Sequence, residues 1–142
     1  MILFCDTSAL VKLYVQEPYS EWTREQAQSA RLCLVSQVAW AEMCAALARK
    51  SRTQQIDAGQ VGDALARLRS EWNGYTRLVV DEALIRSAGE LALALGLRAY
   101  DSVQLASARA ARDVAGESLH FCCFDKQLND AARTLGLRTA SP

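Results

Sequence analysis

The 142 residues are 51% hydrophobic and 23% charged, which suits a globular protein large enough to bury a core. Sixteen basic residues balance sixteen acidic ones, so the net charge does not indicate a basic protein that coats nucleic acid or membranes. No apolar run reaches the length of a membrane span and the N-terminus lacks the basic start of a signal peptide, so we expect a cytoplasmic protein without a membrane partner.

The first predicted unit is a strand, a sharp turn and a helix. Residues 2–5 form an apolar run that is too short for a helix and is typical of a strand buried on both faces. Asp6, Thr7 and Ser8 follow, residue types that cap helices, and an apolar pattern then resumes around the single charge of Lys12. This places the Asp6 carboxylate at the carboxyl end of a buried strand, where open α/β sheets bind ligands.

The rest of the chain alternates between strands and helices. Further strands are expected at residues 32–35, 77–80, 119–124 and 137–139. Helices are expected at residues 20–30, 36–50, 57–72, 82–95 (closed by Gly96), 101–114 and 125–136. The alternation predicts one α/β domain over residues 1–142, with a parallel sheet covered on both faces.

The cysteines are expected to be buried and reduced. They are five in number, an odd count, and none are spaced C-x-x-C, which disfavours disulfides and zinc sites. The only histidine, His120, lies inside the apolar run at 119–124 and is interpreted as structural.

Three aspartates occupy equivalent places, because Asp6, Asp81 and Asp125 each follow a predicted strand and precede a predicted helix. Helix capping is a sufficient explanation for each, and position alone does not separate them. Asp101 is expected to cap the helix at 101–114, with Gln104 at the spacing of a capping box. The pair Asp57 and Gln60 has the same spacing.

Glu42 is harder to explain by capping. It is the only charged residue in the run 38–48, VAWAEMCAALA, which predicts a helix that is buried on nearly all sides. A buried carboxylate needs a partner, either a lysine or arginine elsewhere or a metal ion. Acids gathered at one sheet edge, without histidine or cysteine, suit Mg²⁺ or Mn²⁺. Such a site supports metal-assisted attack of water on a phosphodiester.

Four stretches carry a resemblance to a known family: LFCDTSALVKLYVQEP, VAWAEMCAALAR, AYDSVQLASA and FDKQLNDAARTLGL. Together they resemble PIN-domain proteins, specifically the VapC-type toxins of bacterial toxin–antitoxin pairs. The resemblance implies an α/β/α sandwich with a short, mainly parallel sheet of four to five strands. It also implies that the catalytic and metal-binding residues are Asp6, Glu42, Asp101 and Asp125, with Ser8 in support. Asp81 matches no motif of the family.

The resemblance further implies a function. Similar family members cleave RNA with Mg²⁺ or Mn²⁺, form homodimers, and are inhibited by a VapB-type antitoxin that covers the active-site groove. Within this scheme Asp6, Asp101 and Asp125 are the principal metal ligands, and Glu42 holds or orients the attacking water. Gln104 stands where the family often has histidine.

Other features are left open by the sequence. Asn129, one turn after Asp125, is either near the metal or not, and the cluster Arg49-Lys50-Arg52 is either an RNA contact or a solvated helix end. We hypothesise that the helix at 9–15, with Tyr14, lines a groove for the antitoxin.

Two other functions fit parts of the same pattern. A phosphotransfer hydrolase with Asp6 as nucleophile normally has a second aspartate two residues later, where this chain has Ser8. A catalytically inactive RNA- or protein-binding PIN module would not need the complete set of four acids.

Overall fold

The computed structural model describes residues 1–142 and contains one five-stranded parallel sheet in the order β3-β2-β1-β4-β5. The strands are β1 (Ile2–Cys5), β2 (Leu32–Ser36), β3 (Thr76–Leu78), β4 (Leu119–Cys122) and β5 (Arg138–Ala140). The central strand β1 is buried along its whole length, as its unbroken apolar sequence predicts. The predicted parallel sheet is therefore confirmed.

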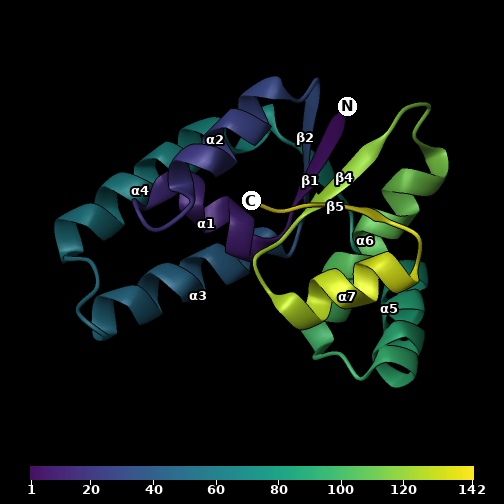
Figure 1. Ribbon diagram of the computed structural model, residues 1–142. Helices are drawn as coiled ribbons and strands as arrows, with labels where there is room; N and C mark the ends of the chain where they lie inside the picture. Colours follow the sequence, from purple (N-terminus) through teal and green to yellow (C-terminus); the bar gives the residue numbers. More distant parts are fainter.

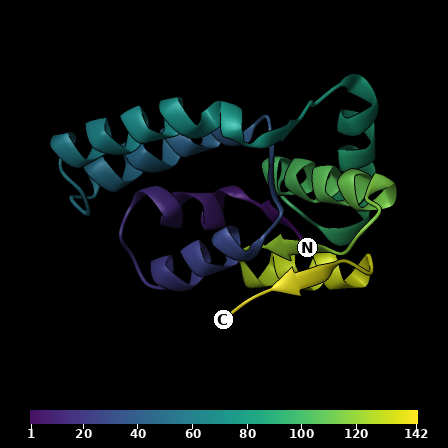
Figure 2. The same ribbon diagram turned by 90° about the horizontal axis from the view of Figure 1, so that it is seen from above.

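Helices cover both faces of the sheet (Figure 1). They are α1 (Thr7–Tyr14), α2 (Ser20–Ser29), α3 (Ala39–Arg52), α4 (Ala58–Glu71), α5 (Glu82–Leu95), α6 (Ala99–Val114) and α7 (Lys126–Thr134), with a short 3₁₀ turn at Trp72–Gly74. Helices α1–α4 lie to one side and α5–α7 to the other, and the view from above in Figure 2 shows the same division.

Each face of the sheet has its own apolar core, because successive strand residues point to opposite sides. Leu3 and Cys5 of β1 pack with the helices α1, α3 and α4. Phe4 points the other way and stacks on Phe121 of β4, with ring centroids 5.8 Å apart, in the core beneath α5, α6 and α7. The α/β/α sandwich expected from the sequence is confirmed.

Local signals in the sequence locate several helix ends correctly. Asp57 and Gln60 form the predicted capping box, with N···O distances of 2.8 and 2.9 Å. Asp81 caps α5 through the amide of Leu84. Gly96 ends α5 with φ at +66°, a left-handed conformation that favours glycine.

Several predicted boundaries are wrong. The strand predicted at 77–80 is Thr76–Leu78. Ser36 is the last residue of β2, paired with Leu78 of β3, so α3 begins three residues later than expected. The strand at 119–124 ends at Cys122. Asp101 does not cap α6, because the helix already begins at Ala99 and Asp101 lies in its first turn. Its carboxylate is therefore free for contacts outside the helix.

Tyr14 of helix α1 is buried, whereas the antitoxin hypothesis needs it to be accessible. Tyr14 is buried against α4, and its hydroxyl lies 2.6 Å from a carboxylate oxygen of Glu71 and 2.6 Å from the hydroxyl of Tyr75. Tyr14 therefore does not line a groove, whereas Val11 and Lys12 of the same helix line a cavity. Docking of an antitoxin along α1 stays a prediction.

The five cysteines form no disulfide, as expected, although Cys33 and Cys44 are only half-buried. None of the helices combines the length and the apolar character needed to cross a membrane.

Candidate active site

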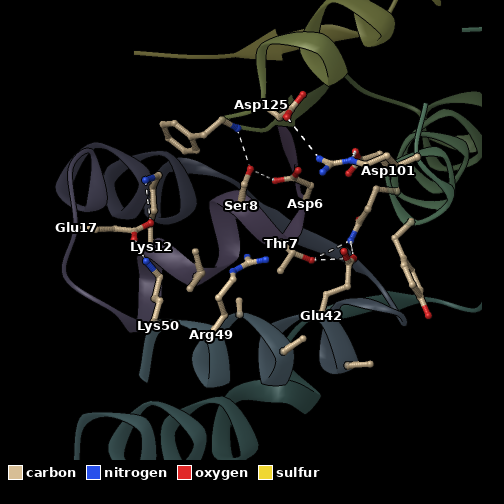
Figure 3. Close-up of a pocket in the computed structure, with 18 residues that line it drawn as sticks. Asp6, Thr7, Ser8, Lys12, Glu17, Glu42, Arg49, Lys50, Asp101 and Asp125 are labelled. Atoms are coloured by element: carbon tan, nitrogen blue, oxygen red, sulfur yellow. Dashed lines mark hydrogen bonds and ion pairs between the residues drawn. The ribbon is translucent and has the colours of Figure 1, made fainter. Parts of the chain in front are cut away.

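One cavity of about 530 Å³ opens at the carboxyl edge of the sheet and is lined by Asp6, Glu42, Asp101 and Asp125 (Figure 3). The strand order explains why these residues meet. β1 and β4 are parallel neighbours, so the turns that follow them, with Asp6 and Asp125, lie side by side. Asp81 follows β3, which is two strands away at the sheet edge, and it does not line the cavity.

Asp6 is the most deeply placed of the four acids, with 4% of its surface exposed. Its Oδ1 accepts hydrogen bonds from the amide of Ala9 (3.0 Å) and the hydroxyl of Ser8 (2.6 Å). Burial raises the pKa of Asp6 to about 6, and the nearby Glu42 charge adds to this, although the hydrogen bonds from Ser8 and Ala9 act in the opposite direction. Keeping the buried Asp6 carboxylate ionised therefore lowers the stability of the folded protein, and a bound cation would reduce this loss.

Ser8 joins the two turns that bear the central acids. Its hydroxyl donates to Asp6 and also accepts a hydrogen bond from the amide of Phe124 (2.9 Å), the residue directly before Asp125. Asp125 itself caps α7 through the amide of Leu128 (2.8 Å) and keeps 40% of its side chain exposed. Capping and facing the cavity are thus compatible roles for Asp6 and Asp125.

Glu42 is held by neutral donors instead of the lysine or arginine considered from the sequence. Its Oε1 accepts from the Thr7 hydroxyl (3.0 Å) and from the side-chain amide of Gln104 (2.7 Å), which is only 1% exposed. Two hydrogen bonds fix the carboxylate without neutralising its charge. Ala41 and Ala45, which border Glu42 on α3, are exposed to the cavity, so α3 is not buried on nearly all sides as predicted.

Asp101 and Asp125 are linked by one arginine that the sequence analysis did not identify. Arg98 lies 3.1 Å from Asp101 Oδ2 through Nε and 3.9 Å from Asp125 Oδ2 through Nη2. The guanidinium is 82% exposed, and ion pairs at such exposure contribute little to stability. Arg98 therefore balances the charge of Asp101 and Asp125 in the lining of the cavity.

The donor set fits a hard divalent cation. Carboxylate oxygens without histidine or cysteine suit Mg²⁺ or Mn²⁺. Burial, and to a smaller extent the Glu42 charge, raise the pKa of Asp6, and a bound cation would act against both. In the present arrangement no three acidic, histidine or cysteine side chains are close enough together to ligate one ion. Asp101 and Asp125 instead share an ion pair with Arg98.

The opposite end of the cavity is basic (Figure 3). Glu17 lies between two lysines, 2.9 Å from Lys12 Nζ and 2.6 Å from Lys50 Nζ. Burial alone would raise the pKa of Glu17, but the ion pairs with Lys50 and Lys12 outweigh it and lower the pKa. Arg49 also lines this end and forms no ion pair. Lys12 could have been found in the sequence by the argument used for Glu42, since it is the only charge in an apolar helix.

Two residues left open by the sequence lie outside the cavity. Asn129 is buried, and its side-chain amide donates to the carbonyl of Cys123 (2.8 Å), so it supports the β4–α7 turn from behind. Arg52 is exposed at the end of α3 and does not reach the cavity, unlike Arg49 and Lys50. The basic cluster is therefore divided by the fold.

Solved structures share the fold of this chain. FitAcB from Neisseria gonorrhoeae is 20% identical, with a TM-score of 0.67, and the match covers 99% of this chain and 97% of that one. VapBC2 from Rickettsia felis, bound to a DNA fragment from its promoter, is 14% identical with a TM-score of 0.65 and coverage of 99% and 98%. At these identities the likeness shows a common α/β/α fold.

The sequence comparisons then give the family. The PIN domain model matches residues 3–133. Ribonuclease VapC46 of Mycobacterium tuberculosis is 34% identical over 140 residues, which are 99% of this chain and 97% of the relative. Ribonuclease VapC49 of the same species is 30% identical over 139 residues, with coverage of 98% and 94%. The chain belongs to the PIN-domain family and, within it, to the VapC-type proteins.

Proposed function

We propose that this protein is a divalent-metal-dependent endoribonuclease and the toxin of a toxin–antitoxin pair. One observation carries the proposal: carboxylates from four separate segments, at residues 6, 42, 101 and 125, line one cavity. Membership of the PIN-domain family and full-length relatives named as ribonucleases support RNA as the substrate. We further propose that residues 1–142 form a single domain, since all five strands belong to one sheet.

The residues of the cavity have distinct proposed roles. Asp6, Asp101 and Asp125 would hold Mg²⁺ or Mn²⁺, and the bound ion would supply activation of water and stabilisation of the phosphodiester's developing charge. Glu42 orients the attacking water, since Thr7 and Gln104 both bind its Oε1. Ser8 keeps Asp6 aligned with the turn that carries Asp125.

The function is tested by incubating the purified protein with single-stranded RNA in the presence of Mg²⁺ or Mn²⁺ and, in parallel, with excess EDTA. We expect cleavage with either metal and none with EDTA. Cleavage that persists in EDTA would contradict metal dependence. Binding without cleavage under every metal condition would favour an inactive binding module. Turnover of phosphomonoesters with no RNA cleavage would favour the phosphotransfer alternative, whose second aspartate is replaced by Ser8.

The basic end of the cavity is the proposed contact for the RNA backbone, with Arg49 as its main residue. Replacing Arg49 with alanine should weaken RNA binding in EDTA and reduce the slope of log Kd against log salt by about one unit, as loss of one phosphate contact does. Arg52→Ala is the matched control, because it removes the same charge from the same helix outside the cavity. Equal effects of the two substitutions would show that only net charge matters.

The proposed partner is a VapB-type antitoxin, and the proposed location is the cytoplasm, where cellular RNA is available. The antitoxin would cover the cavity, whose lining includes Val11 and Lys12 of α1 but not the buried Tyr14. Inhibition of RNA cleavage by a small protein from the same operon would support this assignment; its failure to inhibit would contradict it. We also propose a homodimer, which light scattering of the purified protein tests.

A further inference from the structure

An exposed aromatic ring lies beside the basic end of the cavity. Tyr19 is 57% exposed and stacks on Phe124, with ring centroids 5.8 Å apart and 19° between the ring planes. Trp22 contacts the same phenylalanine edge-on, at 5.9 Å and 88°. Phe124 lines the cavity and directly precedes Asp125. We refer to Tyr19, Trp22 and Phe124 as the aromatic platform.

The backbone of Tyr19 is in an unfavourable conformation for a tyrosine. With φ at 68° and ψ at 9°, it occupies the left-handed region, where glycine and asparagine are favoured. Tyr19 precedes α2 as its N-cap but forms no side-chain capping bond; only its carbonyl is used, by Thr23. Neither the backbone conformation nor helix capping therefore favours a tyrosine here, and strain of this kind is often kept where the side chain has a function.

The platform adjoins the basic end of the cavity through Phe124. Lys12 Nζ lies 4.4 Å from the centre of the Phe124 ring, and Glu17 connects Lys12 to Lys50. Arg49 lies next to Lys50 on α3 and also lines the cavity. Aromatic rings next to cations along a groove are the combination that binds single-stranded nucleic acid, since bases stack on the rings while phosphates meet the cations.

We propose that the outer face of Tyr19 stacks a nucleobase of the RNA strand, one that flanks the phosphodiester held at the carboxylates. This inference rests on the proposed function, because it assumes that RNA enters the cavity. One face of the Tyr19 ring is occupied by Phe124 and more than half of the residue is exposed, so the other face is open to a base. Because every base has a π-face, the subsite selects for an unpaired nucleotide more than for a particular base.

The test measures binding of a labelled single-stranded RNA in EDTA, so that binding is separated from cleavage. Tyr19→Asn should weaken binding by roughly tenfold, as loss of one base stack does, and should leave the slope of log Kd against log salt unchanged because no charge is lost. Tyr19→Phe keeps the ring and should bind like the wild type. Asparagine tolerates the left-handed conformation, so the variant should fold and melt within a few degrees of the wild type.

Two controls isolate stacking from backbone effects. Gln54 is the other residue with positive φ outside glycine, at 59°, and it does not line the cavity, so Gln54→Asn relieves similar strain and should not change RNA binding. An abasic scan of the RNA should locate one position whose base, when removed, weakens binding to the wild type roughly tenfold but barely affects Tyr19→Asn.

The outcomes are distinguishable from those of the functional test. If Tyr19→Asn binds RNA like the wild type, the stacking subsite is wrong. If the variant binds RNA normally but is no longer inhibited by an antitoxin, the platform is a protein contact and the stacking subsite is again wrong. Equal abasic penalties in both proteins would also overturn it. If the wild type shows the abasic effect but cleaves no RNA, the subsite stands and the nuclease proposal fails.

Discussion

Replacing Asp101 with asparagine is expected to abolish RNA cleavage while leaving the fold intact. The carboxylate lies in the first turn of α6, does not cap the helix, and pairs only with the exposed Arg98, so its loss costs little stability. Its proposed contribution is to hold the metal, and metal stabilisation of the transition state is worth several kcal/mol. A fall in the cleavage rate of at least roughly a hundredfold follows. Initial rates at saturating Mg²⁺, with a melting curve of each protein, measure it.

Asp81→Asn is the matched control for this prediction. Asp81 follows a strand and caps a helix as Asp6 and Asp125 do, but it lies outside the cavity. Asparagine caps helices about as well as aspartate, so Asp81→Asn should cleave RNA at the wild-type rate. Asp6→Asn and Asp125→Asn should behave like Asp101→Asn. If Asp81→Asn is as inactive as Asp101→Asn, the site is wrongly assigned. If all four variants cleave RNA at the wild-type rate, the carboxylates of the cavity are not the catalytic residues.

Replacing Asp6 with asparagine should make the metal-free protein more stable at neutral pH. Burial raises the pKa of Asp6 from 3.8 to about 6, so the folded state binds its proton more tightly than the unfolded chain does. The free energy of unfolding of the wild type therefore falls as the pH rises between these two values. Above pH 6 the loss of stability caused by the ionised Asp6 is complete. A shift of this size corresponds to an upper value of about 3 kcal/mol. The asparagine variant keeps the helix cap without this cost.

Denaturant unfolding in EDTA at several pH values measures this effect. The excess stability of Asp6→Asn over the wild type should be small at pH 4 and should grow to its full size by pH 7. Added Mg²⁺ should narrow this difference progressively, because it stabilises the wild type by RT ln(1 + [L]/Kd) and the variant less. Asp81→Asn should show neither effect, since Asp81 is exposed. A variant that is less stable than the wild type at pH 7 in EDTA would contradict the prediction.

Much of the fold is determined by short-range patterns that can be read in the sequence. The apolar run at 2–5 specifies a strand buried on both faces, the capping box at Asp57 starts α4, and Gly96 ends α5 in a left-handed conformation. These features depend on side-chain periodicity and on hydrogen bonds between residues three or four apart. Likeness to the PIN-domain family identifies the four acids of the candidate site, and all four line the cavity.

Only the tertiary structure decides which of the equivalent aspartates share a cavity. The order of the strands places β4 beside β1 and β3 at the edge of the sheet. Asp125 and Asp6 therefore line the same cavity, and Asp81 lies outside it. Strand order depends on contacts between residues far apart in the chain, which local patterns do not encode. The same holds for Gln104, whose spacing from Asp101 suggested a capping box but whose amide binds Glu42 on another helix. It holds also for Tyr19, whose exposed ring is meaningful only because the fold seats it on Phe124.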